Sequence, residues 1–204
     1  MRPASDALIV IDVQNDFCPG GALAVSDGDA VVAPINAMLD DYPVRVLTQD
    51  WHPADHRSFA EQHPGAAPFS SVEMDYGAQV LWPVHCVQGT PGAAFHPDLR
   101  TDPADLILRK GFRAGIDSYS AFFENDQSTP TGLHGYLRSR GVNSLTLAGL
   151  ATDFCVGWSA LDAARLGYVV TVDLTGCRAI DLDGSLDAAL DKMRRAGVTL
   201  VGSR

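Results

Sequence analysis

The chain contains a cysteine at a position where a thiol could act as a nucleophile. Cys155 lies in the stretch LAGLATDFCVGW, where an apolar run ends in a short polar turn and a helical pattern begins. At a helix start, unpaired N–H groups and the positive end of the helix dipole favour thiolate over thiol. The same N–H groups could hold an oxyanion formed on a carbonyl carbon under attack. Cys155 is therefore a candidate nucleophile, and the alternative is a small buried apolar residue.

Two further side chains at predicted strand ends could assist this thiol. Asp12 lies in VIDVQNDF, where an unpaired carboxylate among apolar residues is costly, and Lys110 follows the apolar run in LILRKGF. Taken singly, Asp12 could cap a loop and Lys110 could extend to the surface. If the strands are parallel, all three residues meet at one edge of the sheet. The lysine then compensates the carboxylate and favours the thiolate, and the carboxylate can move a proton.

One carboxylate and two imidazoles form a candidate metal set. Asp50 and His52 in TQDWHP lie two residues apart in an extended segment, so both project to one side. His85 in WPVHCVQG adds the second imidazole. This set suits zinc, iron or manganese and leaves coordination positions for water or substrate. The alternative is a hydrogen-bonded polar cluster, and His56 and His63 are left out because loop histidines are usually solvated.

Three aromatic residues flank these motifs in the sequence. Phe17 lies in QNDFCPGG, Trp82 in VLWPVHC and Tyr119 in GIDSYSAFF. A flat aromatic substrate could stack against such side chains. Ordinary packing in the core is the alternative for each of them.

Short β-rich runs alternate with helical patterns and must position these residues. Several runs are nearly continuous in apolar residues, as expected for strands covered on both faces. The repeated strand–helix–strand order predicts a three-layer α/β/α fold with a mainly parallel six-stranded sheet. The predicted strands are 7–14, 44–51, 105–111, 144–150, 168–174 and 198–203, and the predicted helices are 28–41, 131–141, 155–167 and 184–197.

Residues 53–103 do not follow this alternation of strand and helix patterns. Seven of the twelve prolines lie there, and no strong periodicity appears. We expect a single domain over residues 1–204 in which 53–103 is a loop-rich insertion. Such a segment would fold over the strand ends, where open α/β sheets bind ligands.

Composition and charge argue against several classes of protein. The formal net charge of -10 disfavours nucleic acid and anionic membranes as partners. No run approaches the ~18 apolar residues of a membrane span, and Asp12 interrupts the N-terminal apolar stretch, so no signal peptide is expected. The four cysteines show neither CxxC spacing nor the dense pattern of a disulfide scaffold. We therefore expect reduced thiols and a cytoplasmic protein.

The chain resembles the nicotinamidases, the pyrazinamidase-type branch of the isochorismatase-like cysteine hydrolases. The resemblance covers nearly the whole chain and implies a metal-dependent amidohydrolase that converts nicotinamide, and analogues such as pyrazinamide, to the acid and ammonia in NAD salvage. It implies a small-molecule substrate and leaves a homo-oligomer open. It depends on five motifs in family order: IDVQNDFCPGGALAV, TQDWHPADHRSFA, LWPVHCVQGTPGAAFHPDL, RKGFRAGIDSYSAFFEN and GLATDFCV.

The resemblance also implies a role for each member of the catalytic set. Cys155 would be the nucleophile that forms a thioester, Asp12 the proton shuttle and Lys110 the charged partner. The backbone N–H groups of Ala151 and Cys155 would form the oxyanion hole. A cis peptide bond between Leu150 and Ala151 is implied as well.

The resemblance assigns Asp50, His52 and His85 to one divalent transition metal, zinc first, with iron or manganese as alternatives. Some members place a further histidine ligand eight residues after the metal aspartate, and here that position is Ser58. Water would then complete the coordination sphere, which leaves the identity of the metal open. The resemblance places Phe17 and Trp82 on either side of the pyridine ring, with Tyr119 nearby.

Three other functions compete with this interpretation. Another amide or carbamoyl hydrolase of the superfamily would share the triad but would not need the metal set. An isochorismatase proper belongs to a branch without the catalytic thiol. A non-catalytic relative that binds a metal would keep the fold and lose the chemistry.

Overall fold

Six strands form the central sheet, in the order β5-β2-β1-β6-β7-β8. The computed structural model describes residues 2–203, and every neighbouring pair in this sheet is parallel. The predicted parallel sheet is therefore confirmed. Its strands are β1 (Asp6–Ile11), β2 (Val44–Asp50), β5 (Leu106–Lys110), β6 (Ser144–Leu150), β7 (Val169–Arg178) and β8 (Thr199–Val201).

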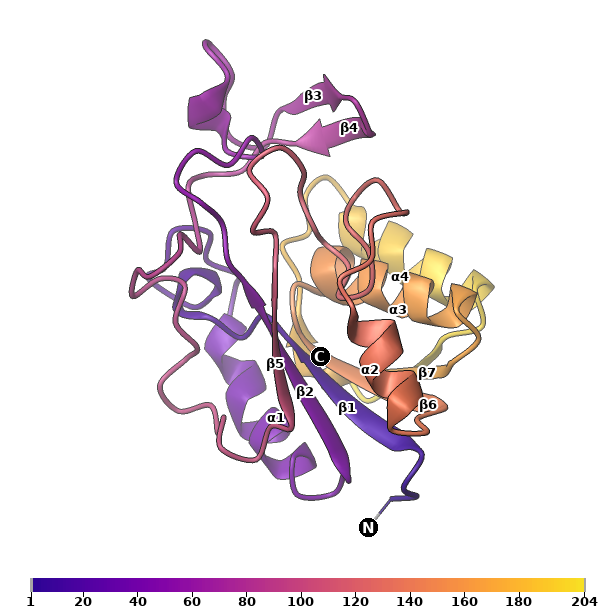
Figure 1. Cartoon of the computed structure of the whole chain (residues 1–204). Helices are drawn as coiled ribbons and strands as arrows, with labels where there is room; N and C mark the ends of the chain where they lie inside the picture. Colours follow the sequence, from indigo (N-terminus) through magenta and orange to yellow (C-terminus); the bar gives the residue numbers. More distant parts are fainter. Residues whose placement is uncertain (1, 204) are drawn as a thin grey trace.

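Helices cover both faces of the sheet. Along the chain, β1 is followed by β2 towards one edge of the sheet, whereas β6 is followed by β7 and β8 towards the other edge. Right-handed crossovers therefore place the intervening helices on opposite faces of the sheet. Figure 1 shows this arrangement, with α1 on one side and the other three helices on the other. This is the predicted three-layer fold. The helices are α1 (Val32–Met38), α2 (Leu133–Ser139), α3 (Gly157–Arg165) and α4 (Ser185–Arg195).

The core lies where the sequence is most continuously apolar. Residues 7–11 of β1, in the middle of the sheet, are each at most 1 % exposed. Their side chains alternate between the two faces, and both faces are covered, so polar residues are excluded from the strand itself. The first polar positions after such strands lie at the edge of the sheet where the site is built.

Two helix starts differ from the prediction. Residues 28–31, expected as the beginning of a longer helix, form a 3₁₀ turn before α1. The expected helix at Cys155 begins as a π-helix over Thr152–Val156, and the α-helix follows at Gly157. Such π-turns are common at functional sites, and this one carries the cysteine.

The proline-rich segment contains regular structure that was not predicted. A 3₁₀ turn (Ala60–Gln62) is followed by an antiparallel hairpin of β3 (Ser71–Met74) and β4 (Gly77–Val80). The hairpin lies at the top of Figure 1, beyond the sheet. Most of its side chains are exposed or half-buried, so the pattern of a buried strand is missing from the sequence.

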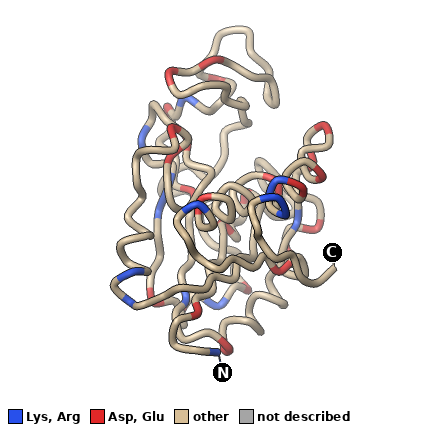
Figure 2. Tube along the Cα trace, turned by 90° about the vertical axis from the view of Figure 1, so that its right-hand side faces the viewer, with Lys and Arg blue, Asp and Glu red and all other residues tan. Residues whose placement is uncertain are grey.

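Charged residues are spread over the outer helices and loops. Figure 2 shows acidic and basic positions interspersed along the trace, on a chain with a formal net charge of -10. Within the described part of the chain, the helices are too short or too polar to cross a membrane.

Candidate active site

Three strand ends bring Asp12, Lys110 and Cys155 together. Asp12 follows β1, Lys110 ends β5, and Cys155 follows β6, and all three strands run in the same direction. Lys110 Nζ lies 2.8 Å from Asp12 Oδ2 and 3.5 Å from Cys155 Sγ. The three side chains are between 0 and 7 % exposed, so solvent screens their charges little.

Asp12 is held firmly at one carboxylate oxygen. Its backbone has a positive φ of 48°, and its N–H donates to Thr48 Oγ1 at 3.2 Å. The Thr48 hydroxyl donates in turn to Asp12 Oδ1 at 2.6 Å. Across residues 2–203, Asp12 Oδ2 accepts no hydrogen bond of good geometry, although Lys110 Nζ is close. This second oxygen is therefore available to accept a proton near the thiol.

The surroundings of Cys155 favour the neutral thiol, whereas its position near a helix start predicts a thiolate. Burial raises the pKa of Cys155 well above its ordinary value; the Lys110 ammonium opposes that rise, and the Asp12 and Asp50 carboxylates add to it. Burial, together with Asp50, also raises the pKa of Asp12, against the opposing effect of Lys110. The thiol proton thus has a nearby acceptor in Asp12, and attack on a substrate requires that proton to move.

The candidate metal set is also assembled. His52 Nε2 lies 3.3 Å and His85 Nε2 3.8 Å from Asp50 Oδ2. The Nδ1 atoms of the two rings lie 2.8 Å from the carbonyl oxygens of Gly111 and Pro83, respectively. A carbonyl oxygen only accepts hydrogen bonds, so Nδ1 of each ring carries a proton and Nε2 is the ring nitrogen that faces Asp50. This donor set fits a divalent transition metal.

Gly111 allows His52 to take this position. Gly111 has a positive φ of 66°, and a Cβ built on it would lie 2.5 Å from Cε1 of the His52 ring. A larger residue would displace the imidazole. The glycine that follows Lys110 therefore positions a metal-set residue on the neighbouring strand.

A second group of potential ligands, His52, His56 and Asp117, lies beside the first. His56 is fully buried, so the expectation of a solvated loop histidine was wrong. Its Nε2 lies 3.1 Å from the Ile116 carbonyl oxygen and its Nδ1 2.7 Å from Ser58 Oγ. Both ring nitrogens are thus engaged, and His56 bridges two loops. His63 is half-buried and bonds to the carbonyl of Arg57.

A narrow cavity opens above Cys155. The three aromatic residues expected at the substrate site, Phe17, Trp82 and Tyr119, all line it. Phe154 completes the wall and contacts Trp82 edge-to-face, with ring centroids 4.9 Å apart. Cys155 and two members of the metal set face the same cavity, and the remaining lining residues are Leu23, Asp117, Ala151 and Ile180.

Gln79 is the main site residue that sequence analysis missed. Its side-chain N–H groups lie 2.9 Å from the Tyr119 hydroxyl and 3.0 Å from Asp117 Oδ2, and its Oε1 accepts a hydrogen bond from Asn125. The Trp82 indole N–H also donates to the Tyr119 hydroxyl, at 3.1 Å. Gln79 therefore ties the β3–β4 hairpin to the aromatic wall. Asp117 shares a motif with Tyr119, but no sequence signal marks Gln79.

The peptide bond between Leu150 and Ala151 is cis, as expected. Ala151 is the residue before the π-helix, and its carbonyl accepts the N–H groups of Phe154 and Val156. Cys155 follows within the same turn, so the two proposed oxyanion-hole residues lie on one short backbone segment. Their role in holding an oxyanion stays a prediction.

Comparisons with known proteins identify the family of this chain. The isochorismatase domain family matches residues 6–204. A nicotinamidase from Acinetobacter baylyi is 51 % identical over 205 residues, covering 100 % of this chain and 96 % of that protein. The structure of the Acinetobacter baumanii nicotinamidase and pyrazinamidase superimposes with a TM-score of 0.98 at 53 % identity, covering 98 % of this chain and 97 % of the other.

Two further structures contain ligands. The L. infantum PnC1 structure, in complex with nicotinate, has a TM-score of 0.85 and 38 % identity, and covers 98 % of this chain and 93 % of its own. The Pyrococcus horikoshii pyrazinamidase structure, in complex with zinc, has a TM-score of 0.77 and 34 % identity, with 98 % and 99 % coverage. By the family match and these identities, the chain belongs to the isochorismatase family, in the branch that contains the nicotinamidases.

Proposed function

We propose that this protein is a nicotinamidase, which hydrolyses nicotinamide to nicotinic acid and ammonia and also accepts pyrazinamide, in NAD salvage. The observation that carries the proposal is the contact of Lys110 Nζ with both Asp12 and Cys155 beneath an aromatic cavity that also faces the metal set. A carbamoyl hydrolase would not need Asp50, His52 and His85 in that position. The full-length similarity to nicotinamidases supports the same substrate.

The thiol chemistry follows from the geometry of the catalytic set. As Cys155 Sγ adds to the amide carbon, Asp12 accepts the thiol proton at its free oxygen. The developing oxyanion is stabilised by the N–H groups of Ala151 and Cys155. Asp12 then delivers the proton to the departing ammonia, and a thioester to Cys155 remains.

Hydrolysis of the thioester uses the same carboxylate in the opposite sense. Asp12 takes a proton from water, which attacks the thioester carbon and releases nicotinic acid, and Cys155 regains its proton. Lys110 stays charged throughout. Burial lowers the pKa of its ammonium, but the Asp12 and Asp50 carboxylates raise that pKa by more, so it lies well above its ordinary value. Lys110 therefore holds the two groups in place and balances the charge.

Asp50, His52 and His85 would hold a divalent metal, zinc by the chemistry of the donor set and by analogy with the zinc complex of the Pyrococcus enzyme. When bound, the metal would offer a ligand site to the pyridine nitrogen and would so orient the ring with its carboxamide towards Cys155. Phe17 and Trp82 would enclose the ring, and Tyr119 and Phe154 line the same cavity.

The proposal is tested by ammonia release from nicotinamide, measured before and after treatment with a chelator. We expect release by the untreated protein, its loss on chelation and its return with zinc. Cys155→Ala should release no ammonia yet retain the metal, whereas Cys18→Ala should behave as wild type. Activity on N-carbamoyl compounds and none on nicotinamide would overturn the assignment.

A further inference from the structure

Helices α3 and α4 leave a hollow between them because the residues that face each other are small. A Cβ built on Gly157 would lie 2.9 Å from the Thr152 carbonyl oxygen and 3.7 Å from the Ala189 methyl. Next to this close approach lies a cavity of about 380 Å³, within the size range of small-molecule sites. We call it the interhelix cavity, and its lining includes Gln127, Phe154, Trp158, Leu161, Ala188 and Lys192.

Two aromatic side chains line the interhelix cavity, and each packs against an aromatic residue of the catalytic cavity. Trp158 is half-buried, and its ring packs against Tyr119 with centroids 5.4 Å apart. Phe154 is half-buried as well and packs against Trp82. Both rings keep an apolar surface towards the interhelix cavity, which suits a planar aromatic ligand.

Lys192, an exposed residue, is the cation among the residues that line this cavity, and Asp153 and Asp162 are the acids. Within residues 2–203, the Lys192 ammonium has no carboxylate within ion-pair distance. The Asp153 carboxylate accepts the N–H groups of Ile180 and Asp181 at 3.1 and 2.8 Å, as well as the Ser185 hydroxyl.

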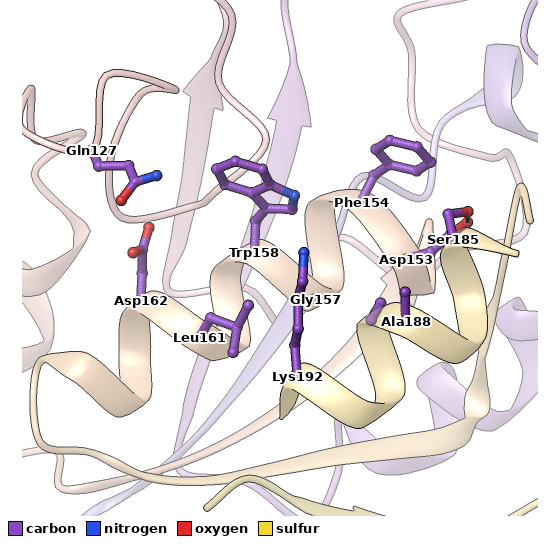
Figure 3. Close-up of a pocket in the computed structure, with 11 residues that line it drawn as sticks. Gln127, Asp153, Phe154, Gly157, Trp158, Leu161, Asp162, Ser185, Ala188 and Lys192 are labelled. Atoms are coloured by element: carbon purple, nitrogen blue, oxygen red, sulfur yellow. Dashed lines mark hydrogen bonds between the residues drawn. The ribbon is translucent and has the colours of Figure 1, made fainter. Parts of the chain in front are cut away.

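The second acid at the cavity, Asp162, has a cationic partner. Asp162 Oδ1 lies 3.0 Å from the Arg165 guanidinium. Figure 3 shows Lys192 reaching up beside Trp158, with Asp162 and Gln127 at one end of the row and Asp153 and Ser185 at the other. A ligand that meets Lys192 therefore gains an unpaired cation, away from both acids.

We propose that the interhelix cavity is a second small-molecule binding site, for a planar aromatic carboxylate. Its ring would lie against Trp158 and Phe154, and its carboxylate would pair with Lys192. The cavity is separate from the catalytic one and shares only the Phe154 side chain with it. Because the site stands on these contacts, it does not depend on the identity of the amide substrate.

The three tryptophans allow a direct test, because each lies in a different environment. Trp158 lines the interhelix cavity, Trp82 lines the catalytic cavity, and Trp51 lies under Arg109. The full chain is labelled with 5-fluorotryptophan, and the ¹⁹F resonances are assigned by Trp→Phe variants and followed during titration with 2-naphthoate. We expect a saturable shift of the Trp158 resonance and none at Trp51.

Matched variants and ligands test the charge. Lys192→Gln should weaken the binding of 2-naphthoate at least tenfold, whereas Arg195→Gln on the same helix should leave it unchanged. Uncharged 2-naphthylmethanol should bind at least tenfold more weakly than the acid, and Ala188→Phe, which fills the cavity from an exposed helix position, should abolish the Trp158 shift.

Four results would overturn the proposal. They are no saturable shift at Trp158, a shift at Trp82 alone, equal affinity in Lys192→Gln and wild type, and sedimentation showing a dimer that is lost in Ala188→Phe. The second would place the ligand in the catalytic cavity. The last would assign the cavity to a contact between copies of the chain.

Discussion

Lys110 Nζ lies 2.7 Å from Asp50 Oδ1, so the cation of the catalytic set also holds a carboxylate of the metal set. The same ammonium lies 2.8 Å from Asp12 Oδ2 and 2.8 Å from the Ser118 carbonyl oxygen. Burial raises the pKa of Asp50, but Lys110 and His52 outweigh it and hold that pKa well below its ordinary value. Two buried carboxylates thus share one cation, and the two sets form a single charge cluster.

Replacing Lys110 by methionine should unbalance this cluster. Lys110→Met leaves two buried carboxylates without their cation, and breaking a buried pair in this way costs about 3–5 kcal/mol. We expect a loss of this size in the free energy of unfolding, measured with urea. We also expect kcat/KM to fall at least about 100-fold. The other lysine of the chain supplies the control: Lys192→Met should change stability by no more than about 0.5 kcal/mol. Equal stability of the two variants would contradict the shared-cation account.

Gln79 should affect substrate binding more than chemistry. Gln79→Leu removes the donors to Asp117 and Tyr119, so the aromatic wall loses its position while Cys155 and Asp12 keep theirs. We expect KM for nicotinamide to rise about tenfold with kcat within threefold, and stability to fall by about 1–3 kcal/mol. Gln62→Leu, at an exposed position of the same insertion, is the control. A loss confined to kcat would show that Gln79 does not act through the pocket wall.

Metal content should separate the two histidine groups. His85→Ala removes one of the three donors of the metal set. We expect the wild-type protein to retain one equivalent of zinc after dialysis and His85→Ala to lose it. His56→Gln should keep that equivalent, because both of its ring nitrogens already bond to Ser58 and Ile116. Elemental analysis of the dialysed proteins measures both. Zinc lost from His56→Gln and kept by His85→Ala would reverse the assignment.

A buried thiol that does not line the catalytic cavity should make stability depend on alkaline pH. Burial raises the pKa of Cys177 to about 12, and its S–H lies 3.2 Å from the Asp173 carbonyl oxygen. The pKa of Cys177 in the folded protein lies above that of a free thiol. The neutral thiol therefore contributes its full share to the free energy of unfolding below about pH 9, and this share is lost as the pH rises towards 12. Between pH 8 and pH 10 the wild type should lose about 1.4 kcal/mol more than Cys177→Ala. Urea unfolding at both pH values measures this difference, and parallel losses in the two proteins would contradict it.

The fold could be predicted where buried strands appear in the sequence as continuous apolar segments. The strand around Ile9 is continuously apolar because both faces of the sheet are covered, and its position was predicted to within a few residues. The β3–β4 hairpin was not, since strand β3 is exposed or half-buried throughout and shows no buried face. The π-turn before α3 was also missed, because a local sequence does not distinguish it from the first turn of an α-helix.

The site was predictable to the extent that it lies at strand ends. A parallel sheet brings Asp12, Lys110 and Cys155 to one edge whatever the register. The contact of Lys110 with Asp50 could not be predicted in this way. These two residues are direct partners in the β2–β5 register, and that register depends on tertiary packing. The pKa of Cys155 depends on burial in three dimensions, which raises it, whereas a position near a helix start favours the thiolate.

The central claim is that Cys155 attacks the amide and carries the acyl group. Its most direct test is acid quenching of the protein during turnover of nicotinamide, followed by mass spectrometry of its peptides. We predict one nicotinoyl group on the peptide that contains Cys155, and none on those containing Cys18, Cys86 or Cys177. Ammonia release by Cys155→Ala near the wild-type rate, with no acylated peptide from the wild type, would contradict it.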